Sequence, residues 1–417
     1  MNRPQKSSAC WVSALTITGI VCAACASAAE KSPAEIVPAP MVKPLEAAQL
    51  AIRRMNWPVA LDDIKQAQAT KNKTPQAEYT VDDLLAYVLY RQNKYAEAAE
   101  AYERLLQSPL MPAAEINGRM KTIAELYYRL GNYLKAVYWA KKCLAADNDQ
   151  PQLEEMLGDS YFRMNDYKNT AATMMAAVSR VEALKQTPKE SWLRLIDDSY
   201  YRLGDIQGMK RALLKLVYYY QRPRDWSELI DLYSQGVHDP HITFEFRRLM
   251  FDLDLLKRPG DYESMVFEAL GENVPAVADQ VLKRAKQDQV FAGPDTFPGQ
   301  YEHLMALVQK QLAPNRARLS KLAQEATRSA TGKDAVLAGQ IYLSYGDYDH
   351  AVDSLTRGIA KGGLEDIDEA RLDLGIAYWK QGQRQLADQA FHAIAKDSKS
   401  AALAELWALR IHQAHGT

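Results

Sequence analysis

The residues of this sequence that could do chemistry are few and widely spaced. His238 and His241, on either side of Asp239-Pro240, stand three residues apart, as close as any two of the seven histidines. A zinc site needs further Cys, His or acidic ligands at regular spacing, and none accompanies this pair. We therefore predict a solvated turn at this point of the chain, and no metal.

Nucleophilic and phosphate-binding motifs are missing as well. The sequence has no Gly-x-Ser-x-Gly, no His-Glu-x-x-His and no Gly-rich phosphate loop, which are the patterns that place a nucleophile, a zinc ion or a nucleotide. Acidic pairs such as Asp62-Asp63, or Asp366 with Asp368, are typical of solvated faces and helix caps. We predict that the protein is not an enzyme and needs no cofactor; the alternative is a hydrolase within residues 226–330.

The elements that carry these residues follow a helical repeat. The positions from Ala124 onward recur one repeat later from Gly158, and Tyr133 and Tyr167 stand 34 residues apart, the period of a helix-turn-helix repeat. The two series superpose residue for residue: Ala124, Tyr127, Gly131, Tyr133, Ala136, Ala140, Cys143, and Gly158, Tyr161, Asn165, Tyr167, Thr170, Met174, Ala177. Small residues let the helices approach, Gly ends the first helix, and aromatics fill the gaps between repeats.

These segments resemble the tetratricopeptide repeat. The resemblance implies an all-α fold, a right-handed helical solenoid with degenerate central repeats. Four repeats are expected over residues 79–223 (79–110, 117–150, 151–184 and 190–223), and two over 332–400 (332–365 and 368–400). Consensus residues thin out over 224–330, where helical pairs are expected at 226–257, at 262–290 and at 299–328, the last divided by Pro314. This region is the expected place for the array to bend.

The ends of the array are predicted from composition and helical pattern. Residues 29–44, with four prolines, favour an extended linker, and residues 45–75 form a helical pair around Pro58. Residues 401–412 form an amphipathic helix that caps the last repeat.

The first 28 residues have the parts of a secretory signal peptide. Arg3 and Lys6 precede an apolar run, and Ala26-Ser27-Ala28 offers a cleavage site after Ala28 or Ala29. The alternative is a lipoprotein signal ending at Cys25. No later segment is apolar enough to span a membrane, so a periplasmic protein is predicted, or an outer-membrane lipoprotein if Cys25 is lipidated.

The charge balance limits the class of partner, and the cysteine content bears on the core. The chain has 51 Lys and Arg against 52 Asp and Glu, so it lacks the basic footprint of a nucleic-acid-binding protein. Cys143 is the one cysteine outside the N-terminal segment, at a position that usually holds a buried Ala, and is predicted to be a small core residue.

The inner face of such an array is lined by the first helix of each repeat. In the four N-terminal repeats its twelfth position reads Tyr90, Tyr128, Phe162 and Tyr201, its ninth reads Tyr87, Glu125, Asp159 and Asp198, and its fifth reads Asp83, Lys121, Glu155 and Arg194. An aromatic row beside an acidic row suits an extended, Pro-rich and partly basic peptide. The alternative is that the aromatics pack against the neighbouring repeat, beside Tyr127, Tyr161 and Tyr200.

Several segments resemble a narrower family, the exported tetratricopeptide proteins that accompany TonB-type energy-transduction systems of Gram-negative bacteria. The resemblance covers most of residues 79–400 and is carried by residues 111–115 with 124–127, 187–192 with 199–205, 218–233, 361–364, 368–370 and 374–375. Residues 206–209, Ile-Gln-Gly-Met, depart from the usual Tyr-x-x-Ala, as does the loosened region 226–330.

What this resemblance implies is a periplasmic protein-binding adaptor that works with TonB and its ExbB/ExbD motor in active uptake across the outer membrane. No catalytic residues come with it. The alternative is an envelope-assembly scaffold for cell-wall or outer-membrane biogenesis proteins.

Overall fold

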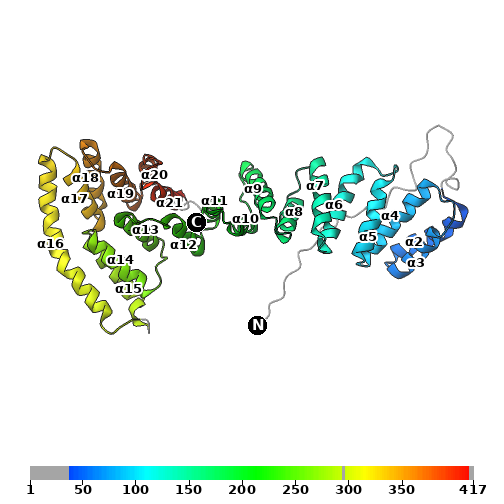
Figure 1. Cartoon of the computed structure of the whole chain (residues 1–417), viewed down its shortest axis with the longest axis horizontal. Helices are drawn as coiled ribbons and strands as arrows, with labels where there is room; N and C mark the ends of the chain where they lie inside the picture. The colour runs from blue at the N-terminus through cyan, green and yellow to red at the C-terminus, as the bar shows by residue number, and fades with distance from the viewer. Residues whose placement is uncertain (1–36, 294–295, 413–417) are drawn as a thin grey trace. The chain divides into compact units, whose positions relative to one another are not determined.

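The computed structural model describes residues 37–293 and 296–412. The expected signal peptide and Cys25 lie outside these residues, as does the first half of the expected linker, residues 29–36. Within them the chain is 78% helical, with 20 α-helices and no strand, which confirms the all-α prediction. The described residues form two compact units, unit 1 within residues 37–148 and unit 2 within residues 149–412 (Figure 1).

The described residues of unit 1 form six helices in antiparallel succession. Each helix packs against the next along the chain: α2 (Ala39–Arg53), α3 (Trp57–Gln68), α4 (Pro75–Arg91), α5 (Tyr95–Gln107), α6 (Ala113–Arg129) and α7 (Tyr133–Ala146). The linker prediction is wrong for its last part, because α2 begins at Ala39 and contains Pro44. Pro40 stands in its first turn, where a missing N–H costs no hydrogen bond, and Met41 and Leu45 are buried against the neighbouring helix.

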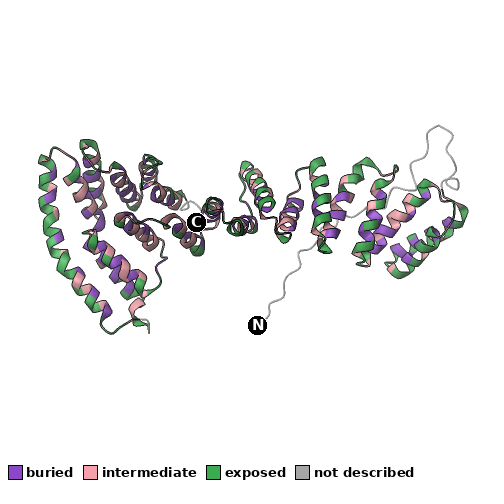
Figure 2. Cartoon of the chain, viewed as in Figure 1, coloured by how far each residue is buried: buried purple, intermediate pink, exposed green. Residues whose placement is uncertain are grey.

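Unit 2 contains the other fourteen α-helices. They are α8 (Pro151–Arg163), α9 (Tyr167–Ala183), α10 (Glu190–Leu203), α11 (Ile206–Tyr220), α12 (Pro223–Ser234), α13 (Pro240–Asp252), α14 (Pro259–Gly271), α15 (Pro275–Gln287), α16 (Gln300–Arg328), α17 (Lys333–Ser344), α18 (Tyr348–Lys361), α19 (Ile367–Lys380), α20 (Arg384–His392) and α21 (Ala401–His412), with a short 3₁₀ helix, η1 (Val290–Ala292), before α16. Buried residues lie on the sides that face neighbouring helices (Figure 2).

The turn between the two helices of a repeat has a constant local design. A residue with positive φ ends the first helix: Asn93, Gly131, Asn165, Gly204, Gly346 and Gly382. Asn and Gly tolerate this left-handed conformation better than other residues. In four of these turns the next residue caps the second helix, because the side chains of Asn132, Asp166, Asp205 and Asp347 accept a hydrogen bond from the backbone N–H three residues on.

Glycines on the first helices allow close packing. A Cβ added to Gly375 would lie 2.4 Å from a ring atom of Phe391, and one added to Gly339 would lie 2.6 Å from Leu355. The second helix of each pair therefore packs directly on the backbone of the first. The predicted core position Cys143 is likewise fully buried, in α7.

Helix α16 differs from its sequence-based expectation. We predicted two helices divided by Pro314, but α16 is one 29-residue helix with Pro314 inside it. Pro removes one backbone hydrogen bond and normally bends a helix rather than ending it when both sides are packed. Leu304 and Val308 are buried on one side of Pro314, and Leu322 and Ala326 on the other. Burial on both sides thus outweighs the local cost of the proline.

The last helices of unit 2 return to its middle. Helix α21 packs on α19 and α20, and also on α11 and α13 (Figure 1). A single apolar core joins residues 174–255 with residues 343–411, including Trp226 and Trp407. Consecutive helices from α11 to α21 therefore form a closed series of contacts, which we call the α11–α21 ring. The loosened region 226–330 lies within this ring.

Candidate functional site

Three of the four aromatics predicted to line the inner face pack on the second helix of their own repeat. The ring centroids of Tyr90 and Tyr95 are 6.1 Å apart, those of Tyr128 and Tyr133 5.8 Å, and those of Phe162 and Tyr167 5.4 Å. Such edge contacts between aromatic rings are favourable. An arginine of the following repeat also lies over the second ring: Arg129 over Tyr95 and Arg202 over Tyr167.

Tyr201, the fourth aromatic, has a different environment. The residue that would pair with it is Ile206 rather than Tyr, and the Tyr201 side chain is 69% exposed. Asp198, one turn earlier on α10, is exposed as well. The repeat in which Ile206 departs from the family pattern is therefore also the one in which the predicted aromatic, Tyr201, is exposed.

Most of the charged residues predicted for the inner face are engaged within the chain. Asp83 pairs with Arg119 at 2.9 Å, and Glu155 with Lys189 at 2.6 Å. Arg194 contacts the buried carboxylate of Asp225 at 2.5 Å and Glu190 at 3.1 Å. Asp159 pairs with Arg163 on the same helix.

The remaining predicted positions are half-buried. Burial raises the pKa of Glu125, against the opposing charges of Lys121 and Arg129. In unit 1 the ring of Tyr87 contacts that of Trp57, with centroids 6.0 Å apart, and the Arg91 guanidinium lies 4.5 Å from the Trp57 ring centre. The residues of unit 1 that were predicted to line the inner face are thus packed against other side chains, unlike the exposed Tyr201 of unit 2.

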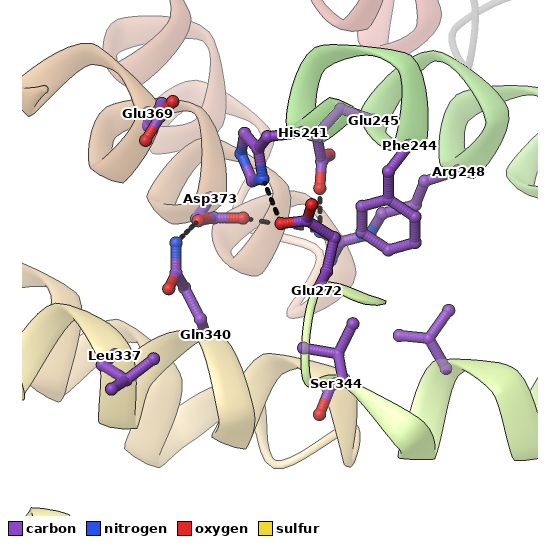
Figure 3. Close-up of a pocket in the computed structure, with 12 residues that line it drawn as sticks. His241, Phe244, Glu245, Arg248, Glu272, Leu337, Gln340, Ser344, Glu369 and Asp373 are labelled. Atoms are coloured by element: carbon purple, nitrogen blue, oxygen red, sulfur yellow. Dashed lines mark hydrogen bonds and ion pairs between the residues drawn. The ribbon is translucent and has the colours of Figure 1, made fainter. Parts of the chain in front are cut away.

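A second site, which the sequence did not predict, is a cavity of about 320 Å³ inside the α11–α21 ring (Figure 3). Its walls come from α13, the α14–α15 turn, α15, α17 and α19. The polar lining residues are His241, Glu245, Arg248, Glu272, Gln340, Ser344, Glu369 and Asp373, and the apolar ones are Phe244, Val274, Val277 and Leu337.

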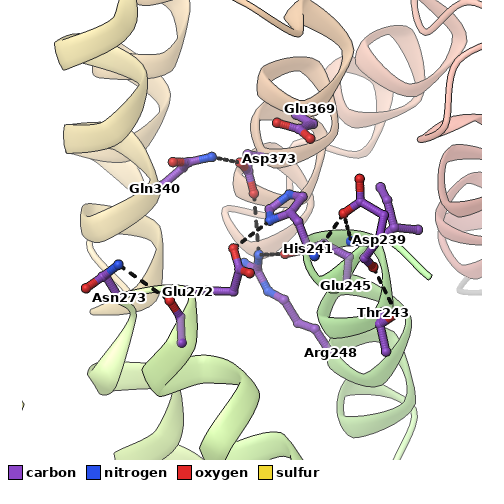
Figure 4. Close-up of polar contacts among 12 residues, drawn as sticks. Asp239, His241, Thr243, Glu245, Arg248, Glu272, Asn273, Gln340, Glu369 and Asp373 are labelled. Carbon is purple, nitrogen blue, oxygen red and sulfur yellow. Dashed lines mark hydrogen bonds and ion pairs between the residues drawn. The ribbon is translucent and has the colours of Figure 1, made fainter. Parts of the chain in front are cut away.

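Buried charges connect the walls of this cavity. Arg248 of α13 contacts Glu245 at 3.0 Å and Asp373 of α19 at 3.4 Å. The Gln340 amide of α17 donates to the other Asp373 oxygen at 2.9 Å (Figure 4). Glu245 and Asp373 are only 1% and 3% exposed. The Arg248 guanidinium therefore pairs with two buried carboxylates, those of Glu245 and Asp373, which come from different helices of the ring.

His241 corrects the prediction of a solvated turn. Only His238 is exposed; His241 lies in the first turn of α13, with its Nδ1 3.0 Å from Glu272. Burial alone would lower the pKa of His241, but the carboxylates of Glu245 and Asp373 and the hydrogen bond to Glu272 outweigh it and raise the pKa to about 9. The imidazole is therefore a cation at neutral pH.

The pKa of the Asp373 carboxyl is also raised, but here burial is the main cause. Burial and the nearby Glu245 raise the pKa of Asp373 above its ordinary value, although Arg248, His241 and the Gln340 hydrogen bond act to lower it. Asp366, predicted to be solvated or a cap, is the N-cap of α19 and accepts from the N–H groups of Asp368 and Glu369. In the described parts of the chain no cluster of three or more His, Cys, Asp or Glu side chains is placed to hold a metal ion.

One sequence signal could have pointed to the cavity. Glu245 stands between Phe244 and Phe246, and Asp373 between Leu372 and Leu374, so both acids occupy positions surrounded by core residues. Charged residues are almost never buried unless they are paired. Their partners lie as far as 125 residues away along the chain, beyond the reach of pattern analysis.

Comparisons with known proteins agree with the repeat architecture. The tetratricopeptide repeat family matches residues 83–109 and 369–400. No curated protein matches the sequence. Across the residues that the structure describes, no helix has the length and apolar character to cross a membrane.

Three similar solved structures are distant matches. PilW, described as a type IV pilus biogenesis factor, is 16% identical over 47% of this chain and 85% of its own, with a TM-score of 0.29. A tetratricopeptide repeat protein from Parabacteroides merdae is 14% identical over 81% of this chain and 98% of its own, with a TM-score of 0.32. Yeast Tom70 is 11% identical over 90% of this chain and 95% of its own, with a TM-score of 0.24. With TM-scores this low, these likenesses add nothing to the functional argument.

The matched repeats and the helical architecture agree on the class of protein. Tetratricopeptide proteins bind protein partners and are in general non-enzymatic scaffolds. The described chain is thus all-helical and contains tetratricopeptide repeats, and such repeats indicate a role in protein–protein interaction.

Proposed function

We propose that this protein is a periplasmic adaptor that binds an extended, Pro-containing and basic segment of an envelope protein at the first-helix face of α10. The observation that carries the proposal is the exposure of Tyr201, 69% of its surface, next to the exposed Asp198. A flat aromatic ring stacks on the turns of a polyproline II segment, and a carboxylate one helical turn away pairs with a Lys of the same segment.

The resemblance to exported tetratricopeptide proteins of TonB systems supports a more specific partner. The resembling residues 199–205 end α10 and include Tyr201. TonB of that family's systems has a Pro-rich periplasmic part with charged residues between the prolines, which matches the chemistry of the Tyr201 surface. The adaptor would then assist TonB-dependent uptake across the outer membrane.

The test is photo-crosslinking in cells. A photo-reactive residue replaces Tyr201 in one variant and Tyr218 in the other; Tyr218 is a matched control, 51% exposed, on the second helix α11. Capture of TonB or ExbD from position 201 but not from 218 is the expected result. Capture of cell-wall or outer-membrane assembly proteins would instead favour the scaffold alternative.

Binding in solution provides an independent measurement. A synthetic peptide of alternating Pro and Lys residues is titrated into the full chain and into the Tyr201→Ala and Tyr218→Ala variants. We expect Tyr201→Ala to weaken binding about fivefold, since stacking on an aromatic ring contributes on the order of 1 kcal/mol, and Tyr218→Ala to leave it unchanged. Equal affinities for all three proteins would contradict the proposed binding face.

A further inference from the structure

Helix α7, in unit 1, carries a stripe of exposed residues opposite its buried side. The buried side, with Ala136, Ala140 and Cys143, packs on α6. The exposed residues recur with the period of a helix, so they share one side of α7 (Figure 2). We use the name α7 stripe for the exposed residues Leu134, Lys135, Tyr138, Lys141, Lys142 and Ala145.

Two apolar side chains of the α7 stripe project into solvent. Leu134 is 70% exposed and Tyr138 is 51% exposed, and they stand four residues apart, so they are neighbours on the helix surface. The repeat does not require apolar residues at these positions. The matching positions of α5, the second helix of the preceding repeat, hold Ala96 and Glu100, which are exposed too. The exposed apolar surface therefore distinguishes α7 from α5.

The charged residues of the α7 stripe all carry the same sign, because α7 contains no Asp or Glu. Lys135 lies 3.5 Å from Glu103 of α5, so its charge is partly balanced. No carboxylate of the described chain pairs with Lys141 or Lys142. The Lys142 ammonium instead lies 4.5 Å from the centre of the Tyr138 ring. The stripe thus presents unbalanced positive charge beside its apolar side chains.

We infer that the α7 stripe binds the surface of a phospholipid bilayer that contains anionic lipids. Leu134 enters the boundary between the headgroups and the acyl chains, and the Tyr138 ring lies at the level of the headgroups. Lys141 and Lys142 contact lipid phosphates, while their methylene groups stay in apolar surroundings. An exposed Leu, an aromatic ring and unpaired lysines on one side of a helix are the features of helices that lie in a membrane interface.

An acidic segment of another protein is the alternative occupant of the α7 stripe. A groove that captures a peptide encloses it between walls, and a Leu134 side chain that is 70% exposed has no such wall beside it. A bilayer needs no groove, because the boundary between headgroups and acyl chains admits a protruding apolar side chain. The unbalanced lysines match the negative potential of an anionic lipid surface. The observations therefore favour a lipid surface.

The test is co-sedimentation of the chain, purified after export, with phospholipid vesicles. Cys25→Ser in every sample removes any lipid anchor. One set of vesicles contains phosphatidylglycerol and phosphatidylcholine, and the neutral set contains phosphatidylcholine alone. We expect about thirtyfold weaker binding to the neutral vesicles, since each lysine near an anionic surface contributes roughly fivefold, and loss of the difference at high salt. Equal binding to both sets, or binding to neither, would overturn the inference.

Variants locate the binding face on α7. Leu134→Ser removes the protruding apolar group, and we expect it to weaken binding to the anionic vesicles roughly tenfold. Lys141→Gln combined with Lys142→Gln removes two charges and should weaken binding about thirtyfold. All three side chains are exposed, so the variants keep the fold. Wild-type affinity in either variant would refute the assignment to this face.

Matched controls lie in unit 2. Leu184→Ser changes a side chain that is 64% exposed, and Lys168→Gln combined with Lys185→Gln removes two exposed charges. Both controls should leave vesicle binding unchanged, and losses equal to those of the α7 variants would contradict a defined binding face. Tyr201→Ala should also leave vesicle binding unchanged, so the lipid inference and the adaptor proposal stand or fall separately.

A last measurement tests the protein alternative. A synthetic peptide of alternating Glu and Leu residues is titrated into the same chain and into the variant with both Lys141→Gln and Lys142→Gln. Vesicle binding without measurable peptide binding is the expected result. Peptide binding that is lost in the double variant, in a chain that does not bind vesicles, would assign the α7 stripe to an acidic protein segment and overturn the lipid inference.

Discussion

The repeats of unit 1 and the α11–α21 ring of unit 2 hold their helices together in different ways. In unit 1 each helix packs on its neighbour in sequence through small and apolar residues, such as Ala98, Ala124 and Ala136, all fully buried. In the ring, buried ionic contacts tie helices that are more than 100 residues apart, such as Arg248 to Asp373. The consensus residues of the repeat make contacts between helices that are neighbours in the sequence. Over residues 226–330 these consensus residues are lost, and this segment makes contacts with helices that are distant in the sequence instead.

This difference changes the expected role of region 226–330. Loosened repeats predicted a place to bend, yet α12 and α13 are held by the C-terminal helices. The Tyr233 hydroxyl donates to Glu405 at 2.6 Å, Asp252 contacts Lys380 and Arg410, and Asp239 contacts Lys399. Several of these contacts join partly exposed residues, so the buried contacts of Arg248 are the critical ones. The following predictions test the contrast between ring and repeats.

The largest expected effect is at Arg248. Arg248→Met leaves the buried carboxylates of Glu245 and Asp373 without their cation, which costs about 3–5 kcal/mol of unfolding free energy. Denaturant unfolding measures the loss, and hydrogen exchange should show it in α13 and α19. Arg104→Met in unit 1 is the control: Arg104 is 47% exposed in its pair with Asp82, so the change should be below about 1 kcal/mol. Equal effects in the two variants would remove the distinction between ring and repeats.

The next effect is a pH dependence at His241. Its pKa is raised from 6.5 to about 9 in the folded protein, so its stabilisation is complete below pH 6.5 and is lost as the pH rises through 9. The contribution is at most about 3 kcal/mol, because each pKa unit corresponds to about 1.4 kcal/mol. Unfolding free energies of the wild type and of His241→Gln, measured from pH 6 to 10, should differ most at pH 6.

A pH-independent difference between those two proteins would show that the charge of His241 does not act in the ring. The charged groups that face this imidazole are Glu245, Arg248, Glu272, Glu369 and Asp373. All are present in both proteins, so the difference isolates the histidine.

A smaller effect is expected at the close contacts within repeats. Gly375→Ala places a Cβ 2.4 Å from the Phe391 ring, and overpacking of this kind costs about 1–3 kcal/mol. Gly118→Ala, within α6 and with nothing within 4 Å of the new Cβ, should stabilise by up to about 1 kcal/mol, since Ala favours helix over Gly. Thermal unfolding measures both, and a Gly375→Ala variant as stable as the wild type would show that the helix pair can separate without cost.

The smallest effect distinguishes the aromatics. Tyr128→Ala removes the ring contact with Tyr133 and should destabilise by about 0.5–1.5 kcal/mol beyond the area it exposes. Tyr201→Ala should change stability by less than about 0.5 kcal/mol, because the side chain is mostly in solvent. If Tyr201→Ala is as destabilising as Tyr128→Ala, Tyr201 is a packing residue and its role as a binding surface loses its support.

The local design of the repeats could be read from the chain itself. The period of 34 residues, the Gly or Asn at each turn and the aromatic that follows it act within a few residues or between adjacent helices. Such short-range signals predicted the all-α repeat structure, and they suggested candidate residues for an inner face. They did not predict that Tyr90, Tyr128 and Phe162 pack within their own repeats while Tyr201 stands free, because that depends on which ring each side chain meets.

The tertiary structure alone decided three features. Helix α16 continues through Pro314 because residues on both of its sides are buried; the ring closes because α21 meets α11 and α13; and Glu245, Arg248, His241 and Asp373 share one cavity. Each depends on partners that are far apart in the chain. Local propensity cannot encode such contacts. They depend on the free energy of burying apolar surface and of pairing buried charges, which contributes only once the distant helices are in place.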